Sequence, residues 1–150
     1  MEKIGFIGLG IMGRPMAKHL LVAGYPLFIL SSSKASSELK TEGAMLMESP
    51  RELAHQADII ITMLPDSPEV ETVMFGSEGL QQGMRPGSLF IDMSTIAPAI
   101  SIKIFKKLQE QNIEALDAPV SGGQAGAEGA TLSIMAGGNE KAFQRALPVF

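Results

Sequence analysis

The N-terminal stretch of the chain constrains its fold more than any other part of the sequence. Lys3–Ile7 is a short apolar run, which predicts a buried parallel strand. Gly8, Gly10 and Gly13 follow at the spacing G-x-G-x-x-G, and Arg14–Leu21 then has the apolar periodicity of a helix. A strand, a glycine-rich turn and a helix in this order are the context in which the pattern binds a dinucleotide.

Each glycine of this turn has its own expected role. The first permits the tight turn, the second lets a pyrophosphate approach bare backbone, and the third lets the helix pack close to the strand. Free N–H groups at the start of the helix attract phosphates. An isolated match is equally compatible with a plain glycine-rich turn, and Arg14 either reaches a phosphate or is merely solvated. The candidate cofactor-binding residues of the turn are Gly8, Leu9, Gly10, Ile11, Met12 and Gly13.

The composition excludes several classes of protein. The chain has 150 residues, 45% of them hydrophobic, which suits one α/β domain with a real core. A net charge of −4 and the lack of a basic cluster beyond Lys106-Lys107 argue against a nucleic-acid partner. No stretch has the length of a membrane span or the pattern of a signal peptide, so we expect no membrane partner. Without cysteine, and with two histidines far apart, we expect a cytoplasmic setting and no metal site.

Strands and helices alternate along the whole sequence, which predicts a Rossmann-type α/β fold with a doubly wound, mostly parallel sheet. Helical patterns lie between the strands, and Ser49 and Asn139 are expected N-caps. The last helix is expected to contain the end of the chain, at Val149-Phe150, and two apolar residues at an end look like a cut. The expected strands are Lys3–Ile7, Pro26–Leu30, Ala44–Met47, Asp58–Met63, Ser88–Met93, Glu114–Asp117 and Leu132–Ala136.

The loop after the second strand bears on cofactor choice. Dinucleotide folds place an acidic residue there, about 20 residues after the glycine turn, to hold the ribose 2′-hydroxyl of NAD. This chain has Ser31, Ser32, Ser33 and Lys34 instead. Three hydroxyls and an ammonium can surround a 2′-phosphate, which favours NADP over NAD. An ordinary polar loop is an equally good interpretation of the residues alone.

Other polar segments also fall at the carboxyl ends of predicted strands, where ligands bind in doubly wound sheets. They are Leu64-Pro65, Ser94-Thr95 and Ser121–Gly123. The last can hold a carboxylate through its hydroxyl and backbone N–H groups, or serve only as a helix cap. Asp92 is either a catalytic carboxylate or, more commonly for such a residue, an acceptor for loop amides.

Four ordered motifs resemble the β-hydroxyacid dehydrogenase family, which includes 3-hydroxyisobutyrate dehydrogenase and tartronate semialdehyde (2-hydroxy-3-oxopropionate) reductase. Together they span almost the whole chain, and Asp58–Pro65 also resembles the reductase branch. The motifs are Gly8–Gly13 with Pro15-Met16-Ala17, Ile91–Thr95 with Pro98, Asp117–Gly123, and Gly129–Gly138.

The resemblance implies a cofactor-binding domain at residues 1–150 and a helical second domain, usually dimerised, that this chain lacks. It assigns Met63, Leu64, Pro65 and Thr95 to the cofactor, and Ser121, Gly122 and Gly123 to the substrate carboxylate. Two departures stand out. Serines replace the usual Asp or Asn-Arg after the second strand, and the family's catalytic lysine belongs to the missing domain. Lys141 does not match its motif, so we expect no catalytic residue in this chain.

The resulting hypothesis is the cofactor-binding part of an oxidoreductase that uses NADP, or else NAD. The parent enzyme interconverts a small hydroxyacid and its semialdehyde, as a homo-oligomer, whereas residues 1–150 alone are inactive. A methyltransferase is a competitor, although the Ser-Gly-Gly turn and the missing acid speak against it. A nucleotide-binding module without chemistry is the other, since a fold alone does not decide function.

Overall fold

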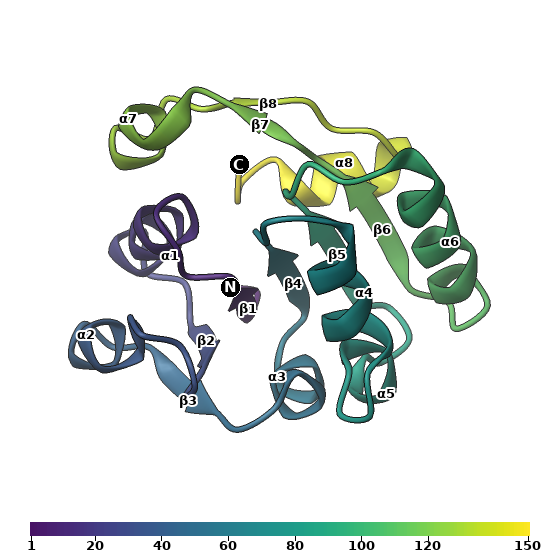
Figure 1. Ribbon diagram of the computed structural model, residues 1–150, viewed down its shortest axis with the longest axis horizontal. Helices are drawn as coiled ribbons and strands as arrows, with labels where there is room; N and C mark the ends of the chain where they lie inside the picture. The colour runs from purple at the N-terminus through teal and green to yellow at the C-terminus, as the bar shows by residue number, and fades with distance from the viewer.

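The computed structural model describes residues 1–150, and its centre is a six-stranded, wholly parallel sheet (Figure 1). The strand order is β3-β2-β1-β4-β5-β6, so the direction of winding reverses between β1 and β4. This is the Rossmann arrangement that the sequence predicts, and ligands bind at such a reversal. The strands are β1 Ile4–Ile7, β2 Leu27–Leu30, β3 Met45–Met47, β4 Ile59–Thr62, β5 Leu89–Asp92 and β6 Glu114–Asp117.

Helices cover both faces of this sheet, because alternate strand residues point to opposite sides. Ile4 and Phe6 of β1 pack with residues of α1, α2 and α8, whereas Ile7 packs on the side of α3 to α6. No helix is long and apolar enough to cross a membrane. The helices are α1 Gly13–Val22, α2 Ser36–Thr41, α3 Pro50–Gln56, α4 Ser67–Phe75, α5 Leu80–Gly83, α6 Pro98–Gln109, α7 Gly123–Glu128 and α8 Glu140–Ala146.

The last expected strand does not join the sheet. β7 (Val120–Ser121) and β8 (Ser133–Ile134) form a separate antiparallel pair, with α7 between them. The same antiparallel pairing continues toward the sheet, because Asp117 and Gly137 exchange two backbone hydrogen bonds of 2.9 and 2.7 Å. The strand expected at Leu132–Ala136 therefore forms over Ser133–Ile134, but outside the parallel sheet. An apolar run indicates a strand without saying which partner it pairs with, and here the nearest partner is the preceding segment.

We call residues 118–137 the arm, since this segment leaves the sheet at β6, passes over the start of α1 and returns (Figure 1). α7 lies against α1, where the ring nitrogen Nε2 of His19 is 2.9 Å from the carbonyl oxygen of Ala127 and 3.0 Å from that of Glu128. The arm thus holds Ser121–Gly123 above the helix that starts at the glycine turn.

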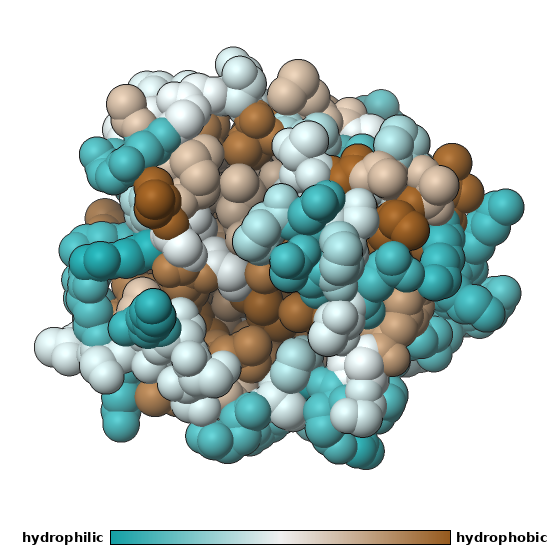
Figure 2. All heavy atoms as spheres, viewed as in Figure 1, coloured by the Kyte–Doolittle hydropathy of each residue, from teal (hydrophilic) through white to brown (hydrophobic).

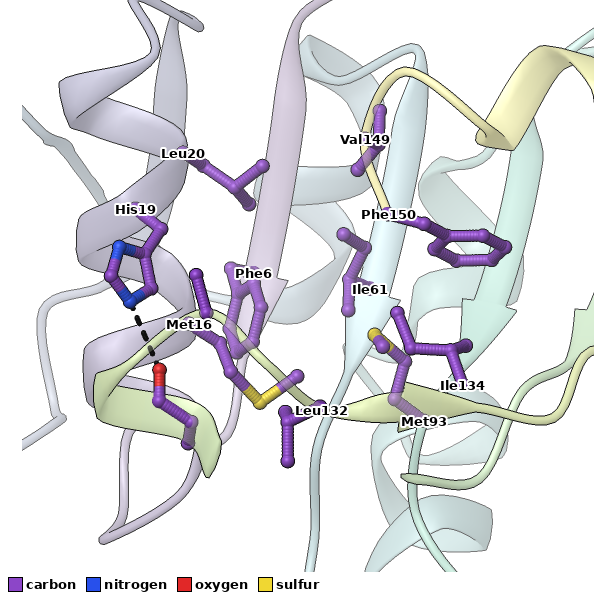
Figure 3. Close-up of a pocket in the computed structure, with 12 residues that line it drawn as sticks. Phe6, Met16, His19, Leu20, Ile61, Met93, Leu132, Ile134, Val149 and Phe150 are labelled. Atoms are coloured by element: carbon purple, nitrogen blue, oxygen red, sulfur yellow. Dashed lines mark hydrogen bonds between the residues drawn. The ribbon is translucent and has the colours of Figure 1, made fainter. Parts of the chain in front are cut away.

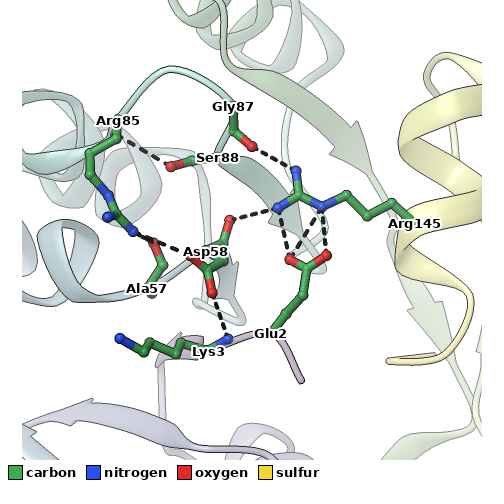
Figure 4. Close-up of polar contacts among 8 residues, drawn as sticks. All are labelled: Glu2, Lys3, Ala57, Asp58, Arg85, Gly87, Ser88 and Arg145. Atoms are coloured by element: carbon green, nitrogen blue, oxygen red, sulfur yellow. Dashed lines mark hydrogen bonds and ion pairs between the residues drawn. The ribbon is translucent and has the colours of Figure 1, made fainter.

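A second set of polar contacts lies at the edge of the sheet where the strands begin (Figure 4). The guanidinium of Arg145 in α8 donates two hydrogen bonds to the carboxylate of Glu2, from Nε to Oε1 at 2.9 Å and from Nη2 to Oε2 at 2.7 Å. Its Nη1 donates to the carbonyl oxygen of Gly87 at 2.7 Å. The same guanidinium therefore ties α8 to the segments that enter β1 and β5.

Candidate cofactor site

The glycine turn between β1 and α1 is shaped by backbone contacts that leave no room for side chains at two of its positions. A Cβ atom at Gly8 would overlap the carbonyl oxygen of Met63, and one at Gly13 would overlap the carbonyl oxygen of Gly8. Gly8 also has a φ of 104°, which disfavours other residues. At Gly10, by contrast, a Cβ would meet no atom within 4 Å. The first and third glycines are thus needed by the fold, and the second leaves its space to a ligand.

The start of α1 is open to an anion. No side chain caps this helix, which begins after Met12, and its first turn holds no acidic residue. The N–H groups at a helix start have no partner within the helix, and the helix dipole adds partial positive charge there. A phosphate group beside Gly10 would satisfy these groups. The residues present therefore fit the pyrophosphate of a dinucleotide.

Two surface grooves meet at Gly10 and Ile11 and continue in opposite directions along the carboxyl edge of the sheet. The first, which we call the β4–β5 groove, passes the turns after those two strands. It is lined by Gly8, Gly10, Ile11, Met12, Gly13, Met63, Leu64, Pro65 and Thr95. The second, which we call the α2 groove, leads to the end of β2. It is lined by Leu9, Gly10, Ile11, Arg14, Pro15, Lys18, Lys34, Ala35, Glu38, Gln124 and Glu128.

A short hydrogen-bond network fixes the two turns of the β4–β5 groove. The hydroxyl of Thr62 donates to Oδ1 of Asp92 at 2.8 Å, and the backbone N–H of Ser94 donates to the same oxygen at 3.1 Å. The backbone N–H of Leu64 donates to Oγ of Ser94 at 2.8 Å. Asp92 is 2% exposed, and this burial raises the pKa of its carboxyl against the lowering effect of its hydrogen bonds. The bond from the Ser94 N–H agrees with the commoner interpretation of Asp92, an acceptor for loop amides, whereas the link through Thr62 and Leu64 was not evident from the sequence.

Of the four candidate residues Ser31–Lys34 in the loop after β2, only Lys34 lines the α2 groove, and it is exposed. The backbone N–H of Ser31 donates to the carbonyl oxygen of Met47, which extends the pairing of β2 with β3. The carbonyl oxygen of Ser31 accepts from Oγ of Ser36 at 3.1 Å. Ser32 and Ser33 lie beside it in the turn. Arg14 forms an ion pair with Glu38, so a carboxylate that the sequence analysis did not single out also lies in this groove.

The predicted substrate residues lie apart from both grooves. Ser121, Gly122 and Gly123 are exposed where β7 passes into α7, and the two glycines have φ values of 139° and 62°. Two residues of the following helix, Gln124 and Glu128, do line the α2 groove, and no pattern in the sequence indicates this. Their position follows from the contact of the arm with α1.

Residues 3–150 match the sequence profile of the NAD-binding domain of 6-phosphogluconate dehydrogenase. The chain belongs to this family of NAD-binding domains. The NAD-binding domain is 44% identical over 148 residues to 2-hydroxy-3-oxopropionate reductase of Escherichia coli, an alignment that covers 99% of this chain and 51% of the relative.

Solved structures agree with this assignment. The 3-hydroxyisobutyrate dehydrogenase of Mycobacterium tuberculosis with L-serine superposes with a TM-score of 0.91 at 38% identity, over 99% of this chain and 50% of that one. Psf3 in complex with NADP⁺ and 2-OPP has a TM-score of 0.91 at 28% identity, over 97% of this chain and 52% of that one. The NAD-binding domain thus spans about half the length of the relatives it matches. Their names confirm the resemblance to β-hydroxyacid dehydrogenases.

The NAD-binding domain also contains an apolar cavity of about 100 Å³ between the sheet and the arm (Figure 3). Phe6, Met16, Ile61 and Met93 point into it, Phe150 also lines it, and His19 is its one non-hydrophobic lining residue. On the face drawn in Figure 2, apolar side chains gather in the middle and hydrophilic ones around them. With so few polar groups the cavity has no means to orient a charged cofactor, so the grooves remain the candidate site.

Proposed function

We propose that this chain is the cofactor-binding half of an NAD(P)-dependent oxidoreductase that interconverts a short β-hydroxyacid and its semialdehyde. The observation that carries the proposal is the pair of grooves that meet at Gly10, where a Cβ would find only open space. The printed names of its relatives, a 2-hydroxy-3-oxopropionate reductase and a 3-hydroxyisobutyrate dehydrogenase, support this substrate class.

The bound nicotinamide supplies the hydride, and the protein supplies binding and orientation. In this proposal the backbone at Gly10 and the uncapped start of α1 bind the pyrophosphate. Met63, Leu64, Pro65 and Thr95 form the wall beside the nicotinamide half and keep water from it. Ser121, Gly122 and Gly123 hold the substrate carboxylate from the arm. No residue of this chain is assigned as the proton donor.

We further propose that the cofactor is NADP rather than NAD. Lys34 lies in the groove that would take the adenosine half, and Ser31 occupies the place of the carboxylate that would repel a 2′-phosphate. Glu38 in the same groove acts against this preference, since it adds negative charge and engages Arg14. The net preference is therefore modest, about tenfold, as one charge-assisted hydrogen bond at an exposed loop would give.

Calorimetric titration of the chain with NADPH, followed by turnover assays, tests the proposal. We expect residues 1–150 to bind NADPH without oxidising it, and a full-length enzyme to oxidise it with short semialdehydes bearing a carboxylate. Absence of binding by the chain would contradict the cofactor site. Binding with no turnover of any semialdehyde by the full-length protein would instead favour a nucleotide-binding module.

A further inference from the structure

Asp92 combines deep burial with incomplete hydrogen bonding. It is the last residue of β5 and is 2% exposed, and its Oδ2 is buried with no hydrogen-bond partner. A buried polar atom without a partner costs free energy, so a side chain that only filled space would be more stable as an apolar one. The other oxygen, Oδ1, must therefore perform a task that an apolar side chain does not.

That oxygen connects two segments that belong to different strands. It accepts from the hydroxyl of Thr62, the last residue of β4, and from the N–H of Ser94 in the turn after β5. Ser94 extends this network to the turn after β4, because its Oγ accepts a hydrogen bond from the N–H of Leu64 there. The three donor–acceptor distances lie between 2.8 and 3.1 Å, and both hydroxyl-bearing side chains are fully buried.

Both turns joined in this way line the β4–β5 groove, through Met63, Leu64 and Pro65 on one side and Thr95 on the other. Thr95 directly follows Ser94 and is exposed, whereas Ser94 is buried. The position of the exposed wall thus depends on buried atoms one residue away. We propose that Asp92 is a positioning residue that sets the spacing of these two turns and so the affinity for the nicotinamide half of the cofactor. This inference rests on the proposed function and deepens it.

The network predicts which substitutions are tolerated. Asp92→Asn keeps an oxygen at Oδ1 for both donors, so the turns stay in place. Asp92→Ala leaves the hydroxyl of Thr62 and the N–H of Ser94 without an acceptor in a buried space, and the turns must shift to satisfy them. None of the hydrogen bonds that these changes affect involves the glycine turn or the α2 groove, where the adenosine half would bind.

The experiment compares two probes on the full chain. NADH or NADPH reports the whole site, and ADP reports the adenosine and pyrophosphate part alone. For Asp92→Ala we expect the Kd of the dinucleotide to rise about tenfold while the Kd of ADP changes by less than about twofold, in line with the loss of one or two hydrogen bonds. In Asp92→Asn, which keeps the acceptor oxygen, the dinucleotide Kd should stay within about threefold of the wild-type value. Asp117→Asn is the matched control, because Asp117 stands on the same edge without a side-chain hydrogen bond to either turn, and it should change neither Kd.

Ser94→Ala provides a second test if Asp92→Ala does not fold. It leaves Asp92 in place and removes the hydroxyl that accepts from the Leu64 N–H, so the dinucleotide Kd should rise about three- to tenfold with the ADP Kd unchanged. Equal losses for ADP and dinucleotide, no loss in either variant, or failure of Asp92→Asn to restore binding would each overturn the positioning role. If the wild-type protein binds ADP but neither NADH nor NADPH, the proposed function is overturned together with the positioning role. This outcome is separate from the others, because it is seen in the wild type and not only in a variant.

Discussion

Asp92 and Asp117 stand opposite each other on the neighbouring strands β5 and β6, as partners in the register of the sheet. Their side chains therefore leave the same face of the sheet. Burial raises the pKa of both carboxyls, and the charge of Asp92 raises that of Asp117 further. The folded protein consequently holds protons at this edge more tightly than the unfolded chain does.

This pair makes a prediction about stability and pH. When a carboxyl has a higher pKa in the folded state, its contribution to stability is complete below its ordinary pKa of 3.8 and is lost as the pH rises through the folded value. We expect the free energy of unfolding of wild type, relative to Asp92→Asn, to fall as the pH rises above about 4. Urea unfolding at a series of pH values measures it. A difference that stays constant with pH would contradict the prediction.

Gly10 and Gly13 should respond to substitution in opposite ways. Gly10→Val places its side chain in open space, so the fold should survive while NAD(P)H binding is lost, because the side chain occupies the place of the pyrophosphate. Gly13→Ala should lower stability, because the added Cβ meets the carbonyl oxygen of Gly8. Titration calorimetry and thermal unfolding of both variants separate the two effects. Unchanged affinity in a folded Gly10→Val would remove the dinucleotide site from this turn.

Cofactor preference should follow charge in the α2 groove. Ser31→Asp should reverse a roughly tenfold preference for NADPH by placing a carboxylate where the 2′-phosphate would lie. Glu38→Gln should strengthen the preference, since it removes a negative charge and releases Arg14. Dissociation constants for NADPH and NADH at one fixed salt concentration test both variants. Equal binding of the two cofactors by wild type would mean that Ser31–Lys34 is only a linker.

The contacts of Arg145 should matter more for stability than those of a typical surface arginine. Arg145→Met removes the paired bonds to Glu2 and the bond to Gly87, and we expect a loss of about 1–2 kcal/mol, with allowance for partial exposure of the pair. Arg51→Met is the matched control, since its pair with Glu78 is 3.8 Å long and exposed on both sides. It should change stability by less than about 0.5 kcal/mol. Equal losses in chemical denaturation would contradict the special role of Arg145.

Local signals in the sequence predict the elements of the fold well, because the residues that set them are adjacent in the chain. Ser49 caps α3 as expected, accepting from the N–H of Glu52 at 3.1 Å, and Asn139 caps α8 by accepting from the N–H of Ala142 at 2.7 Å. The β-branched run at Asp58–Met63 gives the buried strand β4. Which strands pair with one another is harder to predict from the sequence. The pattern of Leu132–Ala136 indicates a strand, but its antiparallel partner depends on the path of the arm.

In the candidate site, too, local features can be predicted from the sequence and contacts between distant segments cannot. The glycine turn is evident from its spacing together with the strand before it and the helix after it, and the turn at Met63–Pro65 follows from the family resemblance. The ion pair of Arg14 with Glu38 joins two helices from separate parts of the chain, and no local pattern indicates it. Asp117 likewise becomes the neighbour of Asp92 only once the register of β5 and β6 is known. Contacts of this kind are set by the sheet and not by nearby residues.

The position of α8 has a consequence for how the protein acquires its structure during synthesis. Ala142 and Ala146 belong to the same apolar layer as Ile4 and Phe6, and Arg145 bonds to Glu2 across 143 positions. At about 5–20 residues per second, a translating ribosome needs on the order of 10 s to bridge that interval. Throughout it, the face of β1 that also packs on α1 and α2 lacks α8, so part of that apolar layer stays uncovered in the nascent chain and a chaperone can bind to it.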